Sequence, residues 1–251
     1  MSGHSKWSSI KHQKGVADAR RGQLFTKLTR EIIVTVREAG SNPETNTRLR
    51  LAIQKARDSN MPMDNIERAI KRGSGEMEGV TLTEMVLEGY GPSGVAILVE
   101  ALTDNRNRTL QDIRNIFSRG GGNLGESGSV TWLFETRGTI IVEAEGPDTE
   151  ELALQAIDAG AEDVSPGDGH VEIYTKPNKL EEVRNALEQS DIHVVSATLA
   201  KVPKTTLEIE ERAALQTLKM LHKLEEVDET QSVSSNVNFP DSVLEKYQEQ
   251  V

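Results

Sequence analysis

The sequence predicts an α+β fold of three domains, in which an N-terminal three-helix domain is followed by two α+β sandwich domains. Three observations lead to this fold class. Apolar residues recur with the period of an α-helix up to residue 75, and from residue 82 they follow the two-residue period of strands. The stretch 137–202 then alternates in the order β-α-β-β-α-β. A chain of 251 residues is long enough for two or three domains of this kind.

The helical domain is expected over residues 17–75, and residues 1–16 form a basic, flexible arm before it. The arm contains no Asp or Glu and no apolar period, so we expect no packed element there. The first helix begins at Asp18 and stops before Gly40. Its inner face is one apolar stripe, made by Leu24, Phe25, Leu28, Ile32 and Val36.

Two further helices complete this domain. The inner face of the second helix consists of Leu49, Ala52, Ile53 and Ala56. The third helix has Pro62 in its first turn and stops at Gly73. It buries Ile66 and Ile70, while Asp64 lies near the positive end of the helix dipole. These three helices can bury one another's apolar faces.

The middle domain is expected over residues 76–135 and 204–251. Two strands, at 82–87 and 95–102, are joined by the turn GYGPSG. Thr109 and Asp112 resemble a capping box at the start of a helix that ends at glycines 120–122, and SVTWLF is predicted to be a strand. Residues 209–227 form a helix, and VSSNVNF returns as the last strand of the same sheet.

The third domain is expected as an insertion over residues 136–203. Its strands are GTIIVEA, AEDVS, HVEIYT and IHVVSATLA, and its helices are DTEELALQAIDAG and KLEEVRNALEQS. The order β-α-β-β-α-β is typical of a ferredoxin-like split sandwich, with both helices on one face of an antiparallel sheet. Pro203 ends this domain.

Composition excludes several classes of protein. The chain has no Cys, so it can form neither disulfides nor thiolate sites, and its five His are scattered. The apolar runs are too short to cross a bilayer, so we expect no membrane partner. The opening MSGHSKWSSIKHQKG lacks the apolar core of a signal peptide. We therefore expect a cytoplasmic protein.

The net charge of −11 conceals a strong asymmetry along the chain. Residues 1–75 hold 15 Lys and Arg against 7 Asp and Glu, a net charge of +8, whereas residues 76–251 hold 14 against 33, a net charge of −19. A basic segment on an acidic body suits a nucleic-acid contact at one end of the molecule. The acidic remainder would be repelled by phosphates or would face a basic protein partner.

The basic segment supplies most of the candidate nucleic-acid-binding residues. Its cations alternate with His and Trp, which suits phosphates together with unpaired bases. The candidates are His4, Lys6, Trp7, Lys11, His12, Lys14, Arg20, Arg21, Lys27 and Arg30. A solvated basic tail, with Trp7 folded back onto the helices, is the alternative.

A second candidate region is TDNRNRT, residues 103–109. Arg106 and Arg108 are expected just before a helix N-terminus, where free N–H groups favour a phosphate. Pairing of these arginines with carboxylates of the protein is an equal alternative. The Gly-rich segment 118–129 lacks the Gly-Lys-Ser/Thr ending of a P-loop, so we interpret it as a turn or loop.

No catalytic constellation is found in the sequence. There is no nucleophile paired with a base, no metal-ligand cluster and no cofactor fingerprint. His170, His193 and His222 are isolated, and Glu143 and Glu145 share the face of one strand as a solvated sheet often produces. We expect no enzyme activity, no cofactor and no metal.

Several strings together resemble the YebC family, which includes bacterial probable transcriptional regulators and the mitochondrial translational activator of cytochrome c oxidase subunit I. They are GHSKWSSIKH, LFTKLTREI, NTRLRLAIQKA, NMPMDNIERAIKRG, EGYGPSGVAILVEALTDNRNRT and GGNLGESGSV. The resemblance is dense in the first half of the chain. It implies a three-domain α+β protein without known catalysis that acts in gene expression.

The resemblance implies a DNA-binding transcriptional regulator, and the alternative is a ribosome-associated translation factor that binds ribosomal RNA and relieves stalls at difficult sequences. An acidic body does not suit wrapping around duplex DNA. One small basic face suits either a local DNA contact or an RNA crevice. Both targets stay open on the sequence alone.

Overall fold

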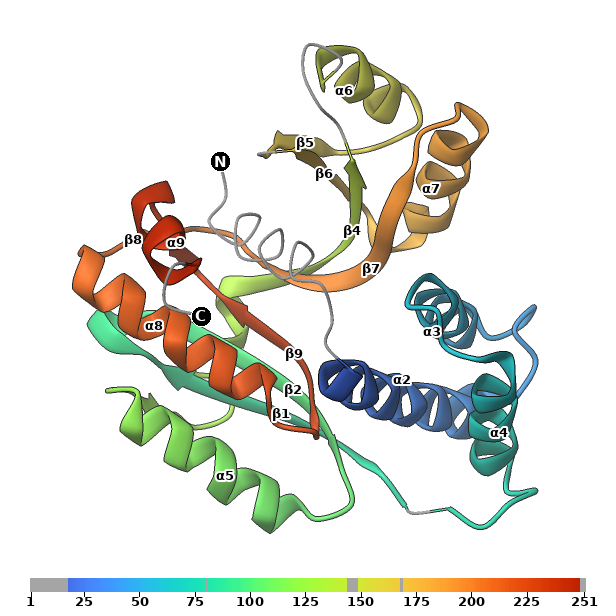
Figure 1. The fold of residues 1–251 in the computed structure, drawn as a ribbon, viewed down its shortest axis with the longest axis horizontal. Coiled ribbons are helices and arrows are strands. Elements are labelled where there is room, and N and C mark those ends of the chain that lie inside the picture. Colours follow the sequence, from blue (N-terminus) through green and yellow to red (C-terminus); the bar gives the residue numbers. More distant parts are fainter. Residues whose placement is uncertain (1–17, 80, 144–148, 168, 249–251) are drawn as a thin grey trace. The chain divides into compact units, whose positions relative to one another are not determined.

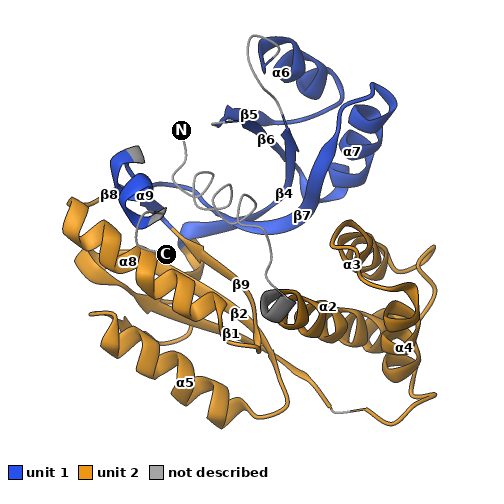
Figure 2. Ribbon diagram, viewed as in Figure 1, with its two compact units in different colours: residues 1–14, 133–208, 236–251 blue, residues 15–132, 209–235 orange. Residues whose placement is uncertain are grey.

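The computed structural model describes residues 18–79, 81–143, 149–167 and 169–248 (Figure 1). These residues fall into two compact units (Figure 2). Unit 2 contains the described residues of 15–132 and 209–235, and unit 1 contains those of 133–208 and 236–251. The chain therefore leaves unit 2 after residue 132, returns to it at residue 209 and leaves it again after residue 235. The division into an arm and three domains stays a prediction.

Unit 2 begins with three helices, α2 (Asp18–Ala39), α3 (Thr47–Asp58) and α4 (Met63–Ser74). The predicted stripes form their common core, because Leu28, Ile32 and Leu49 are almost fully buried there. Helix α2 ends just before Gly40, as predicted. Gly40 has a left-handed φ of +89°, which is incompatible with a continuing α-helix, and its N–H donates to the carbonyl of Val36.

Asn46 joins the end of α2 to the start of α3. Its side-chain oxygen accepts from the N–H of Leu49 at 3.0 Å, which caps α3. Its amide nitrogen donates to the carbonyls of Thr35 and Gly40, each at 2.8 Å. One buried side chain thereby satisfies backbone groups of two helices and sets the turn between them.

The third helix extends beyond the predicted end at Gly73. It continues to Ser74 and is closed by Gly75, which has a left-handed φ of +85°. Gly73 is buried inside the helix, and a Cβ there would lie 2.7 Å from Cβ of Val36 on α2. The glycine at 73 permits close helix packing, so the prediction that it ends the helix was wrong.

The rest of unit 2 is an antiparallel sheet with the strand order β3-β1-β2-β9. Its strands are β1 (Thr83–Tyr90), β2 (Ala96–Thr103), β3 (Asn123–Leu124) and β9 (Thr230–Ser235). A 3-10 turn, Pro92–Gly94, connects β1 to β2. Helices α5 (Arg106–Arg119) and α8 (Glu211–Glu225) pack on the sheet and on each other. The pairing of β9 with β2 confirms the predicted return of the chain to this sheet.

The start of α5 differs from the predicted capping box. The cap is Asn105, whose side-chain oxygen accepts from the N–H of Arg108 at 3.1 Å. The Thr109 hydroxyl is buried and instead lies 2.8 Å from the hydroxyl of Thr103. Arg106 and Arg108 therefore lie within the first turn of the helix. The sequence prediction that they precede the helix was wrong.

The segment SVTWLF is not a strand along its length. Residues Thr131–Leu133 form a 3-10 helix, and the strand begins at Phe134. The reason is Glu88, a buried carboxylate on β1 that accepts the N–H groups of Gly128, Val130 and Thr131 at 2.7–2.8 Å. Those backbone donors are satisfied by a side chain and not by a neighbouring strand.

Unit 1 contains the β-α-β-β-α-β fold that the sequence predicted. Its elements are β4 (Phe134–Glu143), α6 (Thr149–Asp158), β5 (Asp163–Pro166), β6 (His170–Thr175), α7 (Leu180–Gln189) and β7 (Val194–Pro203). A 3-10 turn, Pro177–Lys179, precedes α7. The strand order β5-β6-β4-β7, with every pair antiparallel, is that of a ferredoxin-like sandwich. Strand β7, the last element of this fold, ends at Pro203.

The C-terminal part of unit 1 adds elements that the sequence did not indicate. VSSNVNF is shared between β9 of unit 2 and a short strand β10 (Val237–Asn238), which pairs in parallel with β8 (Leu207–Glu208). Helix α9 (Asp241–Gln248) follows. In the described part of the chain, no helix combines the length and the apolarity that a membrane span requires.

We predict that Gly73→Ala lowers the free energy of unfolding by about 1–3 kcal/mol, because the new Cβ must displace Val36 or shift α4. Gly22→Ala on α2 is the matched control. A Cβ there meets nothing within 4 Å, so alanine raises stability by about 0.5–1 kcal/mol. Urea unfolding of the two variants measures both values, and equal effects of the two substitutions would contradict the packing role of Gly73.

The Glu88 carboxylate generates a prediction on pH. Desolvation opposes its ionisation, but the backbone hydrogen bonds outweigh this and lower the pKa of Glu88 below 4.5. The ionised group therefore stabilises the fold above pH 4.5, and this contribution is lost as the pH falls through the lowered pKa. Glu88→Gln should lower stability at neutral pH by about 1.5–3 kcal/mol.

The difference between the wild type and Glu88→Gln should shrink as the pH is taken below 4.5. Glu126→Gln, at an exposed position in the same Gly-rich segment, is the control and should change stability little. Thermal unfolding across this pH range measures the effect. A difference that grows on acidification would show that the carboxylate is not held ionised by the segment.

Candidate nucleic-acid interface

Most of the predicted arm contacts lie outside the residues that the structure describes. This holds for His4, Lys6, Trp7, Lys11, His12 and Lys14. Arg20 lies on α2, but its side chain is not among those described. The structure describes the side chains of the remaining candidates, which are Arg21, Lys27, Arg30, Arg106 and Arg108.

Lys27 and Arg30 lie about one turn apart on α2 and reach the connection between α8 and β9. Nζ of Lys27 donates to the carbonyl of Glu225 at 2.5 Å. A guanidinium nitrogen of Arg30 donates to the carbonyl of Asp228 at 2.7 Å. Both side chains therefore join the first helix to the segment that returns from unit 1 to unit 2.

The structure brings Arg30 together with Arg108 of α5 at one carboxylate, that of Glu229. An Nη atom of Arg108 donates to Oε1 of Glu229 at 2.9 Å, and Arg30 lies 3.6 Å from the same oxygen. Arg108 also donates to Asp104 at 2.7 Å. We call these four residues the Glu229 cluster; it comprises Arg30, Asp104, Arg108 and Glu229.

The Glu229 cluster neutralises much of the charge of its two arginines. Hydrogen bonds from Arg108 to Glu229 and Asp104 raise the pKa of Arg108. Partial desolvation opposes ionisation of Asp104, but its hydrogen bond with Arg108 outweighs this and lowers the pKa of Asp104. Arg108 and Asp104 therefore remain charged over the physiological range. Arg108 thus pairs with the protein's own carboxylates, one of the two alternatives that the sequence allowed.

Arg106 and Arg21 are placed differently from the Glu229 cluster. Both are exposed, Arg106 in the first turn of α5 and Arg21 near the start of α2. Within the described chain, Arg106 forms no ion pair. Although Arg106 and Arg108 are two residues apart, the helical turn directs them to different sides. Of this pair, Arg106 is the one available to an external phosphate.

Sequence reasoning missed other exposed cations of the helical segment. Arg57 lies in the last turn of α3, and Lys71 and Arg72 lie in the last turn of α4. The signal was present, because cations favour the negative end of a helix and each of these positions precedes a predicted turn. Glu229 was also missed, although it follows the acidic run of residues 225–228.

The histidines do not come together into a metal or catalytic site in the described residues. Nowhere in that part of the chain do three or more His, Asp or Glu side chains gather as metal ligands would. His193 lies 3.5 Å from Glu143, and both side chains are largely exposed. His222 lies 3.2 Å from Glu226, one turn along α8.

A buried acid–phenol pair lies on β6 of unit 1. The hydroxyl of Tyr174 donates to Glu172 at 2.5 Å, and both residues are buried. Burial raises the pKa of Tyr174, and the neighbouring Glu172 carboxylate raises it further. The phenol therefore stays protonated and serves as the hydrogen-bond donor that Glu172 needs.

We predict that Glu229→Gln lowers the free energy of unfolding by about 1–3 kcal/mol, because it removes the charge on which Arg30 and Arg108 converge. Asp228→Asn is the matched control. Arg30 uses only the backbone carbonyl of Asp228 among its contacts there, so this substitution should leave the contact in place. Chemical unfolding compares the two variants, and equal losses would contradict the role of the Glu229 cluster.

Comparison with known proteins gives matches over nearly all of the chain. Residues 5–76 match the model of the TACO1/YebC protein N-terminal domain, and residues 82–237 match that of the TACO1/YebC second and third domain. A probable transcriptional regulatory protein of Dehalococcoides mccartyi is 59% identical over 250 residues, covering 100% of both chains. One from Halothermothrix orenii is 51% identical over 253 residues, again covering 100% of both chains.

A solved structure shows the same fold. The crystal structure of a conserved hypothetical protein from Aquifex aeolicus aligns with a TM-score of 0.85 and 50% sequence identity, covering 92% of this chain and 96% of that one. The chain is a member of the TACO1/YebC family.

Proposed function

We propose that the chain is a non-enzymatic, nucleic-acid-binding regulator of gene expression, and that it acts as a DNA-binding transcriptional regulator in the cytoplasm. The observation that carries this proposal is the confinement of net positive charge to residues 1–75, at +8, on a chain whose remainder is −19. Such a distribution favours one local contact with phosphates and disfavours any wider one.

The exposed cations of the helical segment support this assignment. Arg37, Arg57, Lys71 and Arg72 are exposed on α2, α3 and α4. They are available to phosphates, in contrast to Lys27 and Arg30, which bind carbonyls of the same unit. The predicted arm residues would add contacts before α2. The helices thus offer a phosphate-binding surface with few side chains suited to reading bases.

The relatives support the regulatory part of the proposal. Those from Dehalococcoides mccartyi and Halothermothrix orenii are named probable transcriptional regulatory proteins. A regulator that contacts phosphates and has no base-reading helix binds DNA with only modest sequence specificity. Helices α2 to α4 suit phosphate contacts better than the reading of bases, because Asn and Gln are scarce in them.

We predict that Lys71→Gln with Arg72→Gln weakens duplex DNA binding by the full-length protein at least about fivefold. The slope of log affinity against log salt concentration should become smaller by the equivalent of up to about two phosphate contacts. Lys176→Gln with Lys179→Gln removes the same charge from unit 1 and should change affinity less than about twofold. Fluorescence anisotropy over a salt series measures both. Equal losses would mean that net charge alone, and not the helical segment, governs binding.

Substitutions in the predicted arm, residues 1–16, test whether the target is DNA or the ribosome. If the protein is a transcriptional regulator, wild type should protect a defined promoter in footprinting and should not sediment with ribosomes. Lys6→Ala with Trp7→Ala should then weaken the promoter footprint. If wild type instead sediments with ribosomes and the double variant does not, the DNA target is overturned in favour of a translation factor that binds ribosomal RNA.

A further inference from the structure

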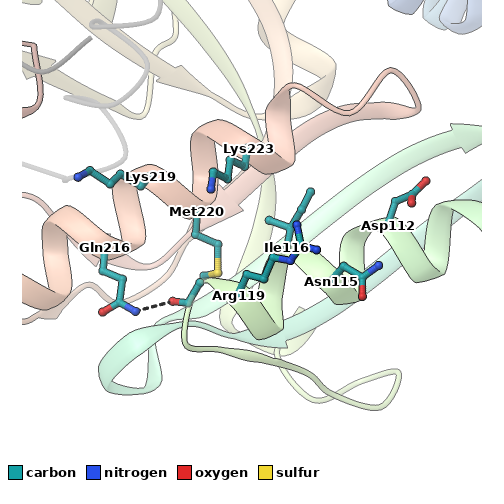
Figure 3. A pocket seen from close by; sticks show the side chains of 9 residues that line it. Asp112, Asn115, Ile116, Arg119, Gln216, Lys219, Met220 and Lys223 are labelled. Atoms are coloured by element: carbon teal, nitrogen blue, oxygen red, sulfur yellow. Dashed lines mark hydrogen bonds between the residues drawn. The ribbon is translucent and has the colours of Figure 1, made fainter.

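A groove lies between α5 and α8 of unit 2, away from the helical segment in the sequence (Figure 3). Its volume is about 430 Å³, the size of a site for a small ligand or one nucleotide. Arg119 and Asn115 line it from α5, and Lys219, Lys223 and Gln216 line it from α8. Half-buried Ile116 and buried Met220 form an apolar floor between the two helices.

The groove concentrates positive charge on an acidic part of the chain. Arg119, Lys219 and Lys223 are all exposed, and none of the three forms an ion pair with another described residue. Of the described residues that line the groove, Asp112 alone is acidic. Lys219 and Lys223 are one turn apart on α8, an arrangement of like charges that costs an isolated helix stability. An anionic ligand would remove this repulsion.

The shape of the groove depends on the Gly-rich end of α5. A Cβ at Gly120 would lie 2.5 Å from Sδ of Met220, and one at Gly121 would lie 2.6 Å from Nε2 of Gln216. The same Gln216 amide donates to the carbonyl of Gly120 at 3.0 Å. The glycines that the sequence indicated as a helix end therefore also let α8 approach and hold the Gln216 amide at the groove.

We propose that this groove binds single-stranded nucleic acid, with Arg119, Lys219 and Lys223 on successive phosphates and an unpaired base over Ile116. The inference rests on the proposed function and adds to it a second contact, on the acidic part of the chain. The amides of Asn115 and Gln216 flank the floor, where they can hydrogen-bond a base edge. The planar Arg119 guanidinium can stack on the base.

Two features favour a single strand over other anions. A duplex presents phosphates on a wide, stiff surface, whereas this site is a groove between two helices with −19 of net charge over residues 76–251 to repel a broad contact. An acidic peptide would satisfy the three cations but would leave the apolar floor without a partner. A nucleotide supplies both a charged backbone and an apolar face.

The test uses the full-length protein and labelled oligouridine and oligothymidine of about 12 nucleotides, a length within the range of known single-strand sites. The groove variant combines Arg119→Gln, Lys219→Gln and Lys223→Gln. The control combines Arg114→Gln, Lys176→Gln and Lys179→Gln, which removes the same charge elsewhere. Arg114 lies on the opposite side of α5, so it tests position on one helix. Circular dichroism and thermal unfolding confirm that both variants fold.

The groove variant should bind either oligonucleotide about tenfold more weakly at about 0.1 M salt, with a salt slope smaller by about 2, and the control should lose less than about twofold. An abasic strand of equal charge should bind wild type more weakly than oligothymidine. Oligouridine bound more tightly than oligothymidine would identify RNA as the ligand, and the reverse would identify DNA.

Other outcomes separate this inference from the proposed function. If wild type binds the strands and the groove variant equals the control, the groove is not the site, while the proposed function stands. If wild type binds no nucleic acid of any kind, both are overturned. If oligoglutamate of equal charge displaces the strand as well as unlabelled oligothymidine does, the groove is an acidic-peptide site and the inference fails.

Discussion

The carboxylate of Glu229 is the contact on which the arrangement of unit 2 depends. The chain leaves this unit after residue 132 and returns at residue 209, so the returning segment must be attached to elements formed much earlier. Glu229 provides the attachment in two ways. Its side chain meets Arg30 of α2 and Arg108 of α5, and its carbonyl accepts from the N–H of Leu102 on β2 at 2.8 Å. Because the residue is buried, these charged contacts are stronger than they would be in water.

This use of charge has a consequence for the surface. Carbonyls and carboxylates of the same unit accept hydrogen bonds from Lys27, Arg30 and Arg108. A cation in the sequence is therefore not always accessible to a ligand. Exposed cations lie on the helices α2 to α4 and in the groove between α5 and α8. Both lie in unit 2, whereas unit 1 contributes an acidic, ferredoxin-like body.

Local patterns predicted the elements well and their ends less well. Apolar periodicity located α2, α3, α4 and the six elements of the ferredoxin-like fold, because burial of one face repeats along each element. The ends failed where a second force competes with the local signal. Gly73 looks like a helix stop but allows contact with Val36, and SVTWLF looks like a strand but its N–H groups bind Glu88. Neither partner is near in the sequence.

The sequence by itself determined the fold class, the order of the elements and the confinement of net positive charge to the first 75 residues, since these follow from periodicity and composition. It also indicated some of the cations that could meet a phosphate, such as Arg106. Only the tertiary structure decided which of them are neutralised internally and which line a groove. The physical reason is that an ion pair such as Arg108 with Glu229 joins residues 121 positions apart, and Lys219 and Arg119 line the same groove only because two helices pack on the same sheet. Such neighbours are set by chain crossing and packing, which no local pattern records.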